Sequence, residues 1–236
     1  MAIRNSTAHE GAESTVAVTG PSTFLNLALV AFALLGLELV LLILEPLIPT
    51  TAGTIEAALV HWIITIVLWA GGSAALVVWA LRHTDFTLAA DVRARGATAR
   101  WLGIGILVLV TLFAQWALRG GVLPPNAEFA ALTDRFGAAG ALAWLVQVVY
   151  YIAELGVMAL IIAFGQRAGD AWFGRGWIPW GGVTLSLTWG LVHFLTQDAA
   201  TGVYGIVLSL VMGTVYVLTG RSLVVAVPIL LVLFII

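Results

Sequence analysis

Long apolar runs alternate with short polar stretches along almost the whole chain, and this pattern predicts its elements. A helix that crosses a bilayer needs about 20 apolar residues, each adding a rise of about 1.5 Å. Seven runs reach or approach that length: residues 24–48, 55–81, 101–118, 141–164, 177–196, 203–218 and 223–236. The pattern predicts an all-α fold, a transmembrane bundle of about seven helices (six to eight) within residues 23–236. A disordered cytoplasmic tail is expected over residues 1–22.

The arginines divide unevenly between alternate connections, and this asymmetry predicts an orientation. Eight of the ten lie in the N-terminal tail or in connections on its side, whereas Arg119 and Arg135 lie in the other set. Positive charge concentrates in cytoplasmic loops of membrane proteins. We therefore expect a multi-pass protein of the cell membrane with a cytoplasmic N-terminus and an external C-terminus.

The composition indicates a lipid environment and limits which kinds of partner are expected. Of the 236 residues, 61% are hydrophobic and 9% charged, whereas soluble domains carry about 25% charged residues. The bilayer is therefore the first expected partner, and another membrane protein or a peptide is a further candidate. The net charge of −2 gives no indication of nucleic-acid binding, and the lack of cysteine excludes disulfides and thiolate metal sites.

The connection after the third apolar run has a helical pattern of its own. Phe129, Leu132 and Phe136 follow one another at helical spacing between Pro125 and Gly137. Such spacing, with a start signal and a glycine stop, predicts a short amphipathic helix on the external face. An ordinary ordered loop is the alternative.

The sixth run carries small residues on one face. Gly205, Ser209 and Gly213 recur at four-residue intervals. Small residues at this spacing allow another helix to approach closely in a membrane. We therefore expect a tight helix–helix contact here.

Five acidic or histidine residues within the predicted spans are candidates for a functional role. They are Glu38, Glu45, His61, Glu154 and His193. A charge near the bilayer centre costs roughly 2.5–3.5 kcal/mol on insertion scales, so such residues usually face inward or stay neutral. We expect Glu45 to be a solvated helix end and His61 an interfacial hydrogen-bonded side chain, while Glu38 lies in a helix–helix contact or lines a cavity.

Glu154 lies near the middle of the fourth run. Gln147, Tyr150 and Tyr151 precede it at spacings that form one polar stripe, which predicts a face turned toward the bundle interior. His193 lies in the next run, roughly 10 Å closer to the external side by helical rise. The two side chains could share a proton, activate a water or bind a metal; alternatively, they form a buried pair that fixes helix packing.

Several short motifs occur in order in the last third of the chain. Residues 153–158 read Ala-Glu-Leu-Gly-Val-Met, residues 189–193 form a Trp-x-x-x-His, and Thr219-Gly220 precedes a Pro-Ile-Leu at 228–230. From about residue 150, within a core of residues 141–236, the chain resembles the CPBP family of integral membrane proteins. This family includes CAAX-prenyl endopeptidases and bacteriocin-processing or Abi-type immunity proteins.

The resemblance implies a function for two of the ionisable residues. In active family members, glutamates and histidines are thought to activate a water, while a final histidine and asparagine hold the oxyanion. Glu154 and His193 match retained positions, so the resemblance implies that they are the candidate catalytic residues.

The departures from the family pattern are equally specific. The first glutamate of the family pair is Ala153, the arginine is Met158, and the last histidine and asparagine fall at Val232 and Ile236. Water activation needs a base within reach, and the oxyanion needs donors aimed at it. Loss of one member of such a unit can remove most of the rate, so the sequence favours a catalytically degenerate member.

Three functions therefore remain open. The first is a degenerate CPBP-like protein that acts as a binding, immunity or partner subunit. The second is an active intramembrane endopeptidase that uses Glu154 and His193, and the third is a small proton- or ion-coupled transporter. The sequence assigns no cofactor and no metal to any of them.

Overall fold

A computed structural model describes residues 19–44, 47, 53–89 and 97–236, and over these residues it confirms the all-α fold. No strand occurs in the part that is described. The elements are α1 (Pro21–Leu44), α2 (Ile55–His83), α3 (Ala97–Leu118), α4 (Pro124–Phe136), η2 (Gly137–Ala139), α5 (Gly140–Phe173), α6 (Trp180–Leu185), η3 (Ser186–Gly190), α7 (Leu191–Thr196), α8 (Ala199–Leu218) and α9 (Leu223–Ile235).

Five helical stretches are long and apolar enough to cross a membrane, which fits a multi-pass membrane protein. They are α1, α2, α3, the continuous stretch from α4 through α5, and α8. The expected fifth span instead begins only after Pro179 and is divided into α6, the π-helical turn η3, and α7. The expected last span is the 13-residue helix α9. The apolar pattern located both segments: the first begins three residues later than expected, and the second matches the expected 223–236 to within one residue.

The predicted N-terminal tail falls mostly outside the described residues, which begin at Thr19. Its last two residues, Pro21 and Ser22, already belong to α1. Proline is favoured in the first turn of a helix because its missing N–H is not needed there. Glu45 also lies outside the described residues.

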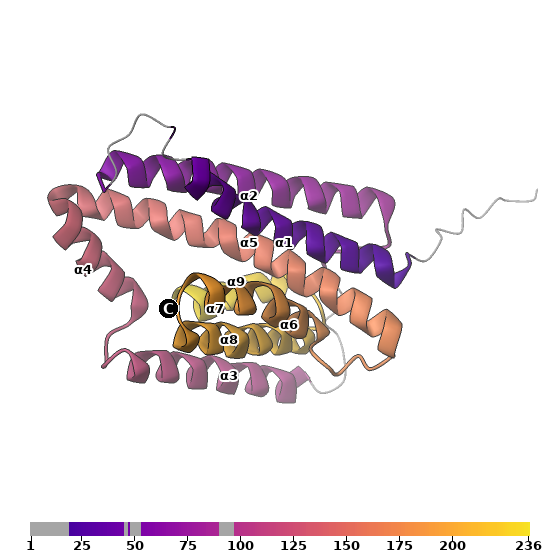
Figure 1. The fold of residues 1–236 in the computed structure, drawn as a ribbon. Coiled ribbons are helices and arrows are strands. Elements are labelled where there is room, and N and C mark those ends of the chain that lie inside the picture. Colours follow the sequence, from indigo (N-terminus) through magenta and orange to yellow (C-terminus); the bar gives the residue numbers. More distant parts are fainter. Residues whose placement is uncertain (1–18, 45–46, 48–52, 90–96) are drawn as a thin grey trace, which may run out of the picture.

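The helices gather on two sides of α5 (Figure 1). α1 and α2 pack along one side of α5, while α6, α8 and α9 pack on the other. α3 contacts α8 and α9, and α4 runs obliquely from the end of α3 to the start of α5. We refer to this side of the bundle, where α4 joins α3 to α5, as the α4 end.

The small residues of α8 allow the expected close contact, and the partner is the continuous helical stretch formed by α6 and η3. A Cβ atom added to Gly213 would lie 2.3 Å from the Cα of Gly182, and one added to Gly205 would lie 3.3 Å from the Cα of Gly190. Ser209 is fully buried between them and donates its hydroxyl to the Gly205 carbonyl. The prediction of a tight contact is therefore confirmed.

A buried polar cluster holds the opposite end of the bundle together. The Gln166 side chain donates to Asp170 (2.9 Å) and to the Ile178 carbonyl, and it accepts the Gly181 amide. Arg221 Nε donates to the same Asp170 carboxylate at 2.8 Å. Because Asp170 lies in the last turn of α5 and Arg221 lies in the turn between α8 and α9, this cluster holds the connection after α5 against the connection between α8 and α9.

Candidate functional site

A cavity of about 530 Å³ lies among the helices at the α4 end. Side chains from both sides of α5 line it, together with the end of α3 and the first turns of α4. Its ionisable lining residues are Glu38, Arg119, Glu128, Glu154 and His193. The two residues predicted as a site thus open onto one space, despite the difference in depth that helical rise had indicated.

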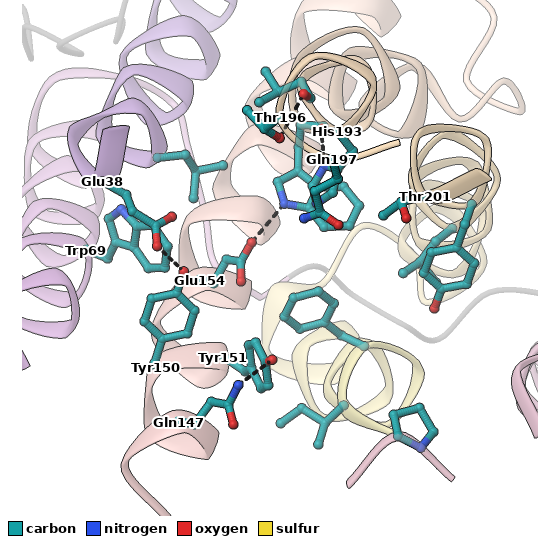
Figure 2. A pocket seen from close by; sticks show the side chains of 18 of the residues that line it. Glu38, Trp69, Gln147, Tyr150, Tyr151, Glu154, His193, Thr196, Gln197 and Thr201 are labelled. Carbon is teal, nitrogen blue, oxygen red and sulfur yellow. Dashed lines mark hydrogen bonds between the residues drawn. The ribbon is translucent and has the colours of Figure 1, made fainter. Parts of the chain in front are cut away.

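Glu154 and His193, both labelled in Figure 2, are connected through Trp189. The Trp189 indole N–H donates to Glu154 Oε1 at 2.8 Å. The Nδ1 of His193 lies 2.7 Å from the carbonyl oxygen of Trp189, and the two rings pack edge to face with centroids 4.3 Å apart. One tryptophan therefore positions both the carboxyl group and the imidazole.

The contact with the Trp189 carbonyl also determines the tautomer of His193. A carbonyl oxygen only accepts hydrogen bonds, so Nδ1 must carry a proton. The neutral ring then keeps Nε2 as its acceptor. Trp189 lies in the π-helical turn η3, and such turns are frequent at functional sites because they displace a side chain from regular helical register.

A second polar group comes from the α1 and α2 side of the cavity. Glu38 Oε1 accepts the Tyr150 hydroxyl at 2.5 Å and lies 3.1 Å from His61 Nε2. The Trp69 ring packs on Tyr150 with centroids 4.9 Å apart. Glu38 therefore both joins helices and lines the cavity, and His61 is hydrogen-bonded as expected.

The amphipathic helix predicted after the third run is present as α4, and it closes part of the cavity. It ends at Gly137, whose φ of 59° lies in the left-handed region that favours glycine. Glu128 on α4 accepts the Tyr151 hydroxyl at 3.1 Å, and Tyr151 in turn accepts from the Gln147 amide. The polar stripe predicted on α5 therefore faces the interior, and α4 is hydrogen-bonded to it.

The cavity ends at Glu154 along α5. Residues 157–166 of this helix are all buried, and α5 contributes no lining residue beyond Glu154. Trp69, at 1% exposure, forms part of the floor and donates its indole N–H to the Leu34 carbonyl. Along α5, the lining of the cavity is therefore confined to the half of the helix that begins at the α4 end.

The lining does not form a recognisable metal site. Within the part of the chain that is described, no group of three histidine, aspartate or glutamate side chains has the geometry to hold an ion. Zinc sites use three or four protein ligands. Glu154 and His193 lack a third ligand among these residues.

The other positions that the CPBP resemblance aligns with family site residues bring no reactive group to this cavity. Ala153 and Met158 are buried apolar side chains, with Met158 fully enclosed. Val232 does not line the cavity, whereas its neighbours Phe234 and Ile235 on α9 do. A water at Glu154 would therefore find no oxyanion donor from α9.

Two contacts of the site could not be predicted from the sequence. Trp189 lies four residues before His193 and therefore on the same helix face, but no sequence pattern pairs its indole with Glu154, 35 residues away. Glu128 lies on α4, and no sequence pattern pairs it with Tyr151, 23 residues away.

No protein-family model matches this chain, and neither the curated proteins nor the solved structures contain a match to it.

Proposed function

We propose that this chain is a catalytically degenerate, CPBP-like membrane protein that binds a ligand or a partner segment in its cavity. The observation that carries the proposal is the geometry around Trp189. The two residues that match the family motif open onto one cavity, yet each is hydrogen-bonded to Trp189. A scaffold that presents a fixed carboxyl group and imidazole to a preformed space is suited to binding.

Peptide hydrolysis is the less favoured function because the cavity lacks the remaining groups. Ala153 and Met158 replace the family's acid and arginine, and α9 offers apolar side chains. Catalysis of acyl transfer draws much of its rate from donors aimed at the oxyanion. Glu154 and His193 alone would supply a base without that stabilisation.

Ion or proton conduction through an open channel is also less favoured. A channel must be accessible from both sides of the membrane at once, whereas the lining of this cavity ends at Glu154 on α5. Ten consecutive buried residues, 157–166, follow along that helix.

The arginine distribution supports an external opening for the cavity. If the N-terminus is cytoplasmic, α1 ends on the outside and the α4 end faces the same way. The ligand would then come from outside the cell or from the external leaflet.

The three functions are separated by two variants measured in proteoliposomes. Cleavage of a fluorogenic membrane-spanning peptide and proton uptake are followed for the parent protein, Glu154→Gln and His193→Ala. The proposed binding function predicts equal, background rates for all three proteins in both assays. Peptide cleavage lost in both variants would establish the endopeptidase, and proton uptake lost in Glu154→Gln alone would establish the transporter.

A further inference from the structure

The charges that line the cavity do not balance. Among the residues that the structure describes, three carboxyl groups, on Glu38, Glu128 and Glu154, face the space, against one guanidinium, that of Arg119. Arg119 interacts electrostatically with Glu128, and Glu38 lies beside His61. Glu154 has no cationic partner among the described residues, since the hydrogen bond that it accepts comes from the neutral indole of Trp189.

The Glu154 side chain is accessible from the cavity. One oxygen of Glu154 accepts the Trp189 indole, while the residue as a whole keeps intermediate exposure in the middle of a 34-residue helix. A carboxylate at this depth gains stability from a cation beside it. The second oxygen is therefore available to a ligand.

The walls around this carboxyl group are aromatic. Trp189 and Tyr151 each pack edge to face against Phe234, with centroids 6.0 and 5.9 Å apart. Trp69 and Tyr150 form a second aromatic pair on the opposite wall, beside Glu38 (Figure 2). Aromatic faces attract cations, and cages of such rings recognise quaternary ammonium groups.

We propose that the cavity binds an organic cation, an amine or quaternary ammonium group carried on an apolar or aromatic body, with Glu154 as its counter-charge. The inference rests on the proposed binding function and names the ligand class of the same site. The volume of about 530 Å³ suits a small molecule, for which pockets span about 300–1,000 Å³. An inorganic cation is disfavoured because the described residues offer no set of three oxygen or nitrogen ligands from acidic or histidine side chains.

The absence of cysteine from the chain allows a direct test. A single cysteine is introduced at Gln197, an exposed residue that lines the cavity at the end of α7. Its rate of reaction with a membrane-impermeant maleimide is measured in right-side-out membranes. The probes are benzyltrimethylammonium and, as a matched anion with the same ring, phenylmethanesulfonate. A second variant, Thr196→Cys, places the reporter at another position that lines the same cavity, so that an effect confined to position 197 can be recognised.

We expect benzyltrimethylammonium at ten times its Kd to slow modification about tenfold by mass action, with no protection by the anion. Glu154→Gln keeps an acceptor for the indole but removes the charge, and it should weaken the cation about tenfold, equivalent to about 1.4 kcal/mol. Glu56→Gln, an exposed residue that does not line the cavity, is the matched control and should leave the Kd unchanged.

The outcomes distinguish the two proposals. Rapid modification without protection by the cation, equal protection by the anion, or an unchanged Kd in Glu154→Gln would overturn the ligand class while leaving a binding cavity. Cysteines at both positions that react only after permeabilisation would contradict the external opening, and with it the proposed binding of an external ligand.

Discussion

Replacement of Trp189 by phenylalanine removes the donor that holds Glu154 while keeping an aromatic ring in place. Loss of a hydrogen bond that leaves a buried acceptor unsatisfied costs about 1–3 kcal/mol. The phenyl ring is also about 40 Å³ smaller than indole, and at ~24 cal/mol per Å³ of residual cavity this adds about 1 kcal/mol. Because Trp189 is only 7% exposed, the packing cost applies in full, whereas the partly exposed Glu154 places the cost of the lost hydrogen bond at about 1–2 kcal/mol. Trp189→Phe should therefore lower the free energy of unfolding by about 2–3 kcal/mol.

A double-mutant cycle separates these two effects. Unfolding is followed by far-ultraviolet circular dichroism during titration of mixed micelles with a denaturing detergent, for Trp189→Phe, Glu154→Leu and the double variant. In the Glu154→Leu background, Trp189→Phe should cost only the packing contribution, which gives a coupling free energy of about 1–2 kcal/mol. In the Glu154→Gln background, Trp189→Phe should again lower the free energy of unfolding by its full amount, because the glutamine amide oxygen still accepts from the indole. Additive effects within about 0.5 kcal/mol in the leucine cycle would refute the hydrogen bond as the link between these helices.

Other predictions concern the packing and the ends of the helices. Gly213→Ala should destabilise the protein by about 1–3 kcal/mol or more, because its Cβ would meet backbone atoms of α6. The control Gly105→Ala lies on α3, where nothing is within 4 Å of the added Cβ, and it should be neutral or stabilising by up to about 1 kcal/mol. Thermal unfolding is measured for both variants, and equal melting temperatures would contradict the contact. Arg221→Met should lower the free energy of unfolding by about 1–3 kcal/mol, since it removes the charged donor to the half-buried Asp170 carboxylate and leaves it the hydrogen bond from Gln166; an unchanged transition would show that the ion pair is not maintained. Hydrogen bonds from the backbone and side chain of Thr201 lower the pKa of the Asp198 carboxyl, which caps α8. The stability it contributes is therefore present above the ordinary pKa of about 3.9 and is lost as the pH falls through the lowered value, so the difference in melting temperature between the parent and Asp198→Ala should narrow below about pH 4.

The apolar pattern was sufficient to predict the helical class and most boundaries, because backbone hydrogen bonds in a bilayer must be satisfied within the segment. It could not predict how 177–196 is divided. That region contains Gly181 and Gly182, whose missing side chains let α6 approach α8 so closely that neighbouring backbones meet. The length of the helix there depends on tertiary contacts and on Pro179, which precedes it.

The candidate site was partly predictable for a related reason. Helical periodicity placed the stripe from Gln147 to Glu154 on one interior face, because side chains at intervals of three and four residues share a face. Pairings between distant helices carry no such signal. The hydrogen bond from Tyr150 to Glu38 joins residues 112 positions apart, and it depends on how α1 packs against α5.

The most direct measurement is water access along α5 from the α4 end. Three single-cysteine variants, Glu154→Cys, His193→Cys and Met158→Cys, are exposed to a small charged methanethiosulfonate reagent in proteoliposomes. Cysteines at 154 and 193 should react from the same side of the membrane, while the cysteine at 158, one turn further along a fully buried stretch, should stay unmodified until the protein is unfolded. Reaction of positions 154 and 193 from opposite sides, or protection of both in the folded protein, would contradict a shared cavity.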